Sequence, residues 1–213
     1  MTVLELRQYT MVPDRRADFV DLFDREFVET QEAVGMEVVG QFTDLDRPDR
    51  YVWIRRFPDM EKRAASLHAF YSGLVWAEHS AAANPMMTEW HDVLLLRPAG
   101  EGHDLAVSAA DRPPIGRNDA EGGPLAILVW DVAPDDAANF AKAVARALPV
   151  ARAVYLTDPS PNTYPRLPVR EDASVVVAIL DGAPKADGAV VNGRAPSQVL
   201  RLAPTPRSAL RGA

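Results

Sequence analysis

Apolar and polar residues alternate in several short segments of the N-terminal half, and helical periodicity lies between these segments. A helix is predicted to begin at Pro13-Asp14, because proline suits a first helical turn and aspartate can cap free amides. Phe19, Phe23 and Phe27 recur every four residues and so share one face of that helix. The predicted strands are residues 4–11, 36–43, 51–57 and 91–96.

A second helical region is predicted to begin at Pro58-Asp59, with apolar residues at helical spacing behind it. Gly73 is predicted to break this region before a further helical piece at residues 76–83. The order of elements in residues 1–98 is therefore βαββαβ, which is the ferredoxin-like arrangement.

Residues 124–213 repeat this order incompletely. Pro134-Asp135 follows a predicted strand as Pro13-Asp14 does, at an offset of 134 − 13 = 121 positions, and it predicts a helix to about residue 148. Residues 181–196 are rich in glycine and proline and too poor in apolar residues for a packed helix, so this copy lacks its second helix. The predicted strands are residues 125–133, 150–157, 174–180 and 198–202.

Composition excludes several classes of function. The chain of 213 residues is 47% hydrophobic and 25% charged, which is ordinary for a soluble globular protein. Its net charge of −7 argues against a nucleic-acid partner, and no basic amphipathic helix suggests a membrane surface. The absence of cysteine excludes disulfides, thiolate catalysis and Cys-ligated metals. The N-terminus does not have the pattern of a signal peptide, and we expect a cytoplasmic protein.

A set of short motifs runs through residues 1–98. The motifs are ELRQYT with Pro13 soon after, Gly35 with Val39-Gly40-Gln41-Phe42, Trp53-Ile54-Arg55-Arg56-Phe57, Arg63, Phe70-Tyr71 with Val75-Trp76 and His79, and Leu94-Leu95-Leu96-Arg97-Pro98. Together they resemble the NIPSNAP family, a branch of the dimeric α+β-barrel proteins. Many members carry histidine followed two residues later by tryptophan on the third strand, whereas this chain has Trp53 and Arg55 there.

The resemblance implies a fold and a pocket. In dimeric α+β-barrel proteins the sheets of two subunits pack on each other, and here one chain can supply both sheets. We therefore predict an α+β protein in which two tandem ferredoxin-like units, 1–98 and a degenerate 124–213, form an intramolecular barrel and are joined by a linker at 99–123. The wider superfamily is similar to cofactor-free monooxygenases, haem enzymes and small isomerases or cyclases, with a pocket between sheet and helices.

Arg55 is the first candidate catalytic residue. It lies two residues from Trp53 on one strand, so both side chains point to the same face. An arginine among aromatic rings can bind a carboxylate, an enolate or a phenolate. The alternative is a buried arginine that pairs with an acid such as Glu5. Tyr9, which lies four residues after Glu5 in the first predicted strand, is a candidate substrate-binding residue.

The second helical region carries further candidates, namely His68, Tyr71, Trp76 and His79. His68 and Tyr71 are three residues apart, and so are Trp76 and His79, so the members of each pair can share a helical face. His79 matches the family pattern and is the preferred proton carrier or haem ligand, while packing or surface exposure is the alternative for each residue. Glu89 is a further candidate, because Glu89 and His91 can form an acid–base pair or a weak surface salt link.

The preferred hypothesis is a cofactor-independent enzyme for a small apolar, aromatic or polyketide-like molecule. Arg55 would stabilise an oxyanion and His79 would move a proton, with or without dioxygen. The alternatives are haem bound through His79 or His68 and a non-catalytic interaction module. No metal-binding, phosphate-loop or dinucleotide motif is present in the sequence. We also expect a homodimer, because exposed faces of the second unit can pair with another chain.

Overall fold

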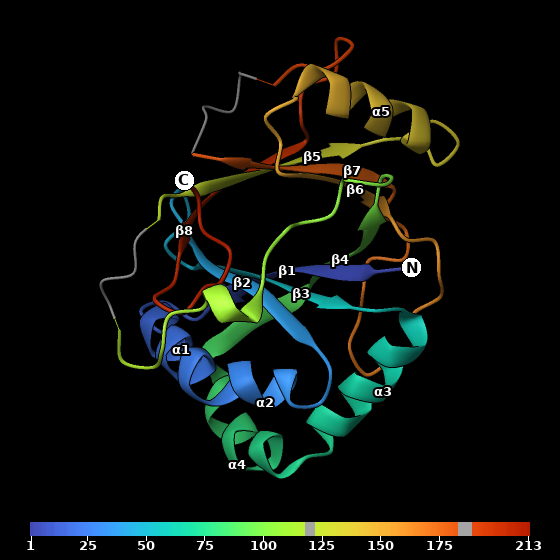
Figure 1. The fold of residues 1–213 in the computed structure, drawn as a ribbon. Helices are drawn as coiled ribbons and strands as arrows, with labels where there is room; N and C mark the ends of the chain where they lie inside the picture. The colour runs from blue at the N-terminus through green and yellow to red at the C-terminus, as the bar shows by residue number, and fades with distance from the viewer. Residues whose placement is uncertain (118–121, 183–188) are drawn as a thin grey trace.

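The computed structural model describes residues 1–117, 122–182 and 189–213. Eight antiparallel strands close into one barrel in the order β1-β3-β2-β8-β5-β7-β6-β4 (Figure 1). The strands are β1 (Val3–Met11), β2 (Glu37–Asp44), β3 (Arg50–Phe57), β4 (Met87–Pro98), β5 (Leu125–Asp131), β6 (Ala153–Thr157), β7 (Val175–Asp181) and β8 (Gln198–Pro204).

The helices cover the barrel on two sides (Figure 1). α1 to α4 lie over the first half of the sheet, and α5 lies over the second half. They are α1 (Arg16–Leu22), the π-helix η1 (Phe23–Phe27), α2 (Val28–Glu32), α3 (Met60–Tyr71), α4 (Leu74–Ala83), the 3-10 helices η2 (Asn84–Met86) and η3 (Ala109–Asp111), and α5 (Ala137–Ala147).

The predicted start of the first helix was early by a few residues. Asp14 has a φ of 65°, in the left-handed region, so it turns the chain instead of capping the helix. Arg15 is the N-cap and makes no side-chain capping bond. The second Pro-Asp pair behaves similarly, since α5 begins after Asp136. Proline followed by aspartate therefore marks the turn that leads into each of these helices.

Other helix predictions are confirmed. Phe19, Phe23 and Phe27 lie on one buried face, and the successive ring centroids are 6.0 and 5.9 Å apart. Asp59 caps α3 by accepting a hydrogen bond of 2.7 Å from the backbone N–H of Lys62. Gly73 separates α3 from α4, as predicted.

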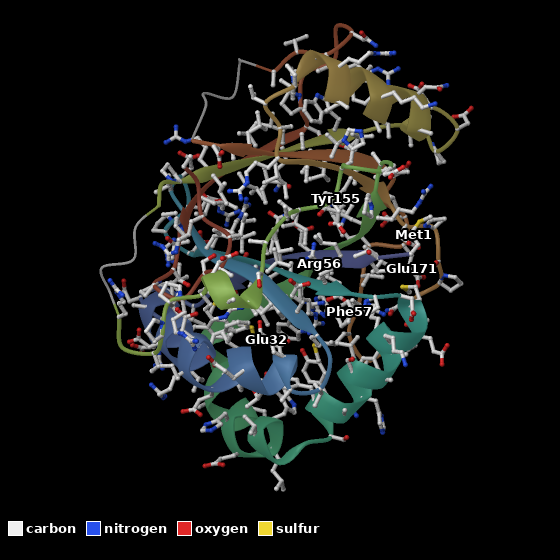
Figure 2. All side chains as sticks on the ribbon, in the orientation of Figure 1. Met1, Glu32, Arg56, Phe57, Tyr155 and Glu171 are labelled. Carbon is white, nitrogen blue, oxygen red and sulfur yellow. The ribbon has the colours of Figure 1, made fainter. Side chains whose placement is uncertain are left out.

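Strand alternation divides the protein into three apolar layers. Leu4 and Leu6 of β1 point into the barrel, where residues from all eight strands form one core. The intervening residues of β1 point outward, beneath α1 to α4, and a third layer lies beneath α5. Arg56 and Phe57 show the same alternation, because Phe57 lies on the helix side of β3 and Arg56 on the other side (Figure 2).

Two seams join the halves of the barrel, which confirms the prediction of two ferredoxin-like halves in one chain. Leu96–Pro98 of β4 pairs with Tyr155–Thr157 of β6, and Phe42–Asp44 of β2 pairs with Leu202–Pro204 of β8. Within the described residues between β7 and β8, 182 and 189–197, the chain forms no helix. The domain boundaries at 98 and 124 remain a prediction.

Candidate functional site

Four charged side chains form a fully buried cluster beneath α1 to α4. Glu5 accepts hydrogen bonds from Arg7 Nη1 at 2.7 Å, Arg55 Nε at 2.8 Å and Arg63 Nε at 2.6 Å. The register of β1 against β3 places Glu5 opposite Arg55, and Arg63 reaches them from the first turns of α3. We call these four residues the arginine cluster.

The cluster carries three positive charges and one negative charge. Burial by itself raises the pKa of Glu5, but the charges of Arg55, Arg7 and Arg63 outweigh it and hold that pKa far below its ordinary value. Burial lowers the pKa of Arg63, although a guanidinium still stays protonated at neutral pH. The cluster therefore has a formal net charge of about +2.

A cavity of about 320 Å³ is connected to this cluster through Tyr9, which lines the cavity and bonds to Arg7. We call it the aromatic pocket. A smaller extension of about 30 Å³ continues inward from it and shares Tyr9, Tyr71, Trp76 and Met87 with its wall. The wall of the main cavity consists of Tyr9, Tyr71, Trp76, Asn84, Met87, Trp90, Tyr164, Arg166 and Leu167.

Both halves of the chain build this pocket. Tyr164, Arg166 and Leu167 belong to the segment 158–174, which connects β6 to β7 and returns to the first half near α3 (Figure 1). Arg63 holds this segment, because its Nη1 donates to Asn162 Oδ1 at 3.0 Å and to Thr163 Oγ1 at 3.2 Å.

The tyrosines of the pocket wall connect it to the arginine cluster. Arg7 Nε donates to the Tyr9 hydroxyl oxygen at 2.9 Å. Burial raises the pKa of Tyr71, and the nearby guanidiniums of Arg55 and Arg7 oppose this rise. Trp53 lies at the inner extension, and its Nε1 has no hydrogen-bond partner among the described residues.

Four of the residues predicted from the sequence do lie at this cavity. Tyr9, Tyr71 and Trp76 line both of its parts, and Trp53 lines the inner extension. Arg55 instead lies behind the wall, where it pairs with Glu5 and donates to Gln31 Oε1 at 3.1 Å. The alternative expected from the sequence, a buried Arg55–Glu5 pair, is thus present.

The histidines predicted to act here lie elsewhere. His79 shares a face with Trp76, since both rings contact Phe27, but its side chain is 23% exposed and its Nε2 is 3.5 Å from Glu26 Oε2. His68 is exposed, because the buried face of α3 is formed by other positions. Neither histidine lines the pocket, so neither fits as an axial haem ligand there.

Glu89 is also outside the pocket. It is exposed and lies 2.8 Å from His91 Nδ1, which makes it the surface salt link of the alternative interpretation. The pairing of β1 with β4 shifts register between Gln8 and Thr10, and this irregularity breaks simple alternation near Trp90. Trp90 consequently lines the pocket, although its side chain remains 37% exposed.

Sequence reasoning missed Arg7, Arg63, Tyr164 and Arg166 as site residues. Arg7 could have been found, because it lies between Glu5 and Tyr9 on the same face of the first strand. Tyr164 carries no local signal, since it reaches the pocket only through the return of segment 158–174. A larger hollow of about 540 Å³ lies at the β4–β6 seam, but prolines and charged residues supply much of its lining. Unlike the aromatic pocket, where Tyr9 bonds to Arg7, it has no lining residue that bonds to the arginine cluster.

No helix in the described ranges has the length and apolar character needed to cross a membrane. The same ranges contain no cluster of three or more histidine, aspartate or glutamate side chains that could hold a metal ion.

Comparison with known proteins identifies the first half. The family model described as NIPSNAP matches residues 4–100. A search of curated proteins gave no match. A NIPSNAP-like domain protein from Burkholderia xenovorans is 23% identical over 53% of this chain and 90% of its own, with a TM-score of 0.42.

Among the solved structures that match are two that cover 97% or more of this chain. A protein from Fusobacterium nucleatum, named "putative monooxygenase", is 11% identical over 100% of this chain and 96% of its own, with a TM-score of 0.55. A protein of the same name from Lactobacillus acidophilus is 13% identical over 97% of both chains, with a TM-score of 0.54. These likenesses show a shared fold. Residues 4–100 of this chain therefore belong to the NIPSNAP family, and the second half completes an α+β barrel around them.

Proposed function

We propose that this protein binds a small, mainly apolar molecule with an aromatic ring in the aromatic pocket and, as an enzyme, acts on it without a cofactor. The observation that supports this proposal is the pocket wall, in which aromatic side chains from both halves stand directly in front of a buried cationic cluster. A core without a cavity would have favoured the non-catalytic interaction module instead.

The size and lining of the pocket suit a ligand of one or two rings. Ligand pockets usually measure about 300–1,000 Å³ and combine apolar walls with a few polar groups. Tyr71 stacks on Tyr164 with ring centroids 6.0 Å apart, and Trp76 meets Tyr71 edge to face at 4.8 Å. These rings can enclose a flat ligand, since aromatic pairs contribute beyond their buried area.

The chemistry proposed is stabilisation of an anion formed from the ligand. Loss of a proton from a ring-activated CH₂ group gives an enolate, which the positive cluster behind the wall stabilises. In the oxygenase form, dioxygen adds at that carbon and takes up a proton to give a hydroperoxide, which loses water to leave a carbonyl. An isomerase or cyclase would use the same anion without dioxygen. The names of the two full-length structural neighbours agree with the oxygenase form.

His79 has no part in this scheme. The described lining of the pocket contains neither histidine nor carboxylate, so the proton released by the ligand passes to water at the open mouth. The field of the arginine cluster makes that release easier.

Binding can be tested by quenching of tryptophan fluorescence with 2-naphthol and 1,4-dihydroxynaphthalene. We expect saturable quenching that weakens by about tenfold in Trp76→Ala, equivalent to about 1.4 kcal/mol. Leu74→Ala is the matched control, because Leu74 lies on the same helix, is 87% exposed and does not line the pocket. Dioxygen uptake with 2-tetralone, which has a CH₂ group between its ring and its carbonyl and can form the enolate, then distinguishes the oxygenase form from the others. Uptake measured without protein is subtracted. Absence of saturable binding, or equal binding by Trp76→Ala, would contradict the proposal.

A further inference from the structure

We infer that the aromatic pocket selects its ligand as an oxyanion, a ring-borne phenolate or enolate, whose oxygen enters the inner extension and accepts hydrogen bonds from the Tyr9 and Tyr71 hydroxyls. This inference rests on the proposed function and names the class of molecule that the pocket takes. Four features of the described residues support it, namely the charge of the arginine cluster, the unsatisfied donors, the tyrosine hydroxyls and the size of the extension.

The charge of the arginine cluster is not balanced by the protein around it. Beyond Glu5, the described partners of Arg55 are uncharged, namely Gln31, the sulfur of Met36 and the rings of Trp53 and Phe57. Arg63 likewise contacts neutral side chains of segment 158–174. Arg7 bonds to Glu5 and to the Tyr9 hydroxyl and lies 5.6 Å from the centroid of the neutral Trp53 ring. An uncompensated buried charge is costly, so a negative charge placed nearby is stabilised.

Several buried donors in this region lack acceptors among the described residues. They include Nη2 of Arg7, Nη2 of Arg63 and Nε1 of Trp53. Arg55 Nη2 is different, since it lies 2.8 Å from Glu5 Oε2. Buried donors are normally satisfied, and an excess of donors with no acceptor indicates a place prepared for an acceptor such as an oxyanion. Trp53 lines the inner extension and is only 2% exposed.

The tyrosine hydroxyls link the arginine cluster to the pocket, because they contact the guanidiniums and also line the cavity. The Tyr9 oxygen already accepts from Arg7 Nε, so its own O–H remains free to donate elsewhere. Tyr71 lines the pocket as well and lies within the influence of Arg55 and Arg7. A hydroxyl whose oxygen is held by a cation is a stronger donor than an isolated one.

The inner extension has room for one oxygen substituent and little more. Its volume is about 30 Å³, against the roughly 10–15 Å³ that a cavity needs to hold one water molecule. The ring of the ligand therefore stays in the main cavity, and the oxygen points inward to the tyrosines.

The test compares 4-nitrophenol with its methyl ether, 4-nitroanisole, on the full chain. Visible absorbance reports the fraction of bound nitrophenol that is ionised. We expect phenolate to bind at least about tenfold more tightly than the ether, and the bound phenol to ionise at least one pH unit lower than in water, which is the same factor. This comparison uses only the unmodified protein.

Variants then test the role of the tyrosines. Tyr9→Phe and Tyr71→Phe should each reduce the preference for phenolate by about fivefold, whereas Tyr164→Phe, in the same wall but without a contact to the arginine cluster, should change it less than about twofold. Circular dichroism checks that each variant is folded.

Equal binding of the ether and the phenolate would overturn this inference and leave the proposed function intact. An unchanged preference in Tyr9→Phe, Tyr71→Phe and their combination would overturn the assignment of the tyrosines. Failure of both probes to bind would overturn the inference together with the function on which it rests.

Discussion

Glu5 organises the site at the scale of single residues. Its carboxylate is the shared acceptor for three buried guanidiniums from two strands and one helix. Such a group is weak evidence for stability as a whole, because desolvation opposes the attraction, but removal of one partner leaves the others uncompensated.

We therefore expect Glu5→Gln to destabilise the fold by about 3–5 kcal/mol. Equilibrium unfolding in urea measures this change. The control is Glu26→Gln, because Glu26 is partly exposed and contacts His79 at 3.5 Å, so its loss should cost less than about 1 kcal/mol. A similar small cost for both variants would show that the cluster is solvated.

Asp24 should make the stability of the fold depend on pH. It lies in the π-helix η1, and burial raises its pKa to about 6 against the weaker opposing effects of Thr205 and Arg207. Between about pH 4 and pH 6, the Asp24 carboxyl is therefore protonated in the folded state and ionised in the unfolded state. The contribution of Asp24 to the free energy of unfolding falls as pH rises through that window and stays low above it.

Asp24→Asn should therefore stabilise the protein more at pH 8 than at pH 4, by about 2–3 kcal/mol. Urea unfolding of both proteins at the two pH values gives this difference directly. An equal effect of the substitution at pH 4 and pH 8 would mean that the carboxylate is well solvated or paired.

At the scale of elements, the segment 158–174 completes the pocket. It is held to the first half by Arg63 and by a backbone bond of 2.9 Å from Arg170 N–H to the carbonyl of Val93. Asn162 is central to it, because its side chain accepts from Arg63 and from the Tyr164 N–H and donates to the carbonyl of Leu167.

Asn162→Ala should loosen this segment, since it removes an acceptor for a buried charged donor, an interaction of about 1.5–3 kcal/mol. Hydrogen exchange in 158–174 should become faster and binding of aromatic probes weaker. Ser160→Ala in the same segment is the control, because the Ser160 hydroxyl makes no hydrogen bond to the described residues. Unchanged exchange in Asn162→Ala would show that other contacts hold the segment.

Element prediction from the sequence succeeded where periodicity and turn residues were strong. All eight predicted strands are present, and Asp59 and Gly73 act as expected. Of the site, the sequence located the aromatic residues of β1, β3 and the α3–α4 region, because these follow local spacing. It could not place His79 outside the pocket, which depends on the packing of α4 against η1, or bring in Tyr164 from a segment far along the chain.

At the scale of the whole molecule, the barrel interior is one apolar core shared by both halves. Leu4 and Leu6 of the first half and Leu200 and Leu202 of the second half are all buried there. Either half alone would expose an apolar sheet face of a size that soluble monomers rarely show.

A fragment of residues 1–98 should therefore fail to remain a folded monomer. We expect it to self-associate or aggregate, as seen by size-exclusion chromatography with light scattering, because pairing with a second copy is the available way to cover the sheet. A monomeric fragment with cooperative unfolding would contradict the shared core.

The most direct test of the account is a crystal structure of the full chain with 4-nitrophenol bound. We expect the ring in the aromatic pocket, against Tyr71, Trp76 and Tyr164, with its phenolic oxygen within hydrogen-bonding distance of the Tyr9 or Tyr71 hydroxyl. A ring bound in the hollow at the β4–β6 seam, with the aromatic pocket empty, would contradict the account. So would a phenolic oxygen that points to the mouth of the pocket.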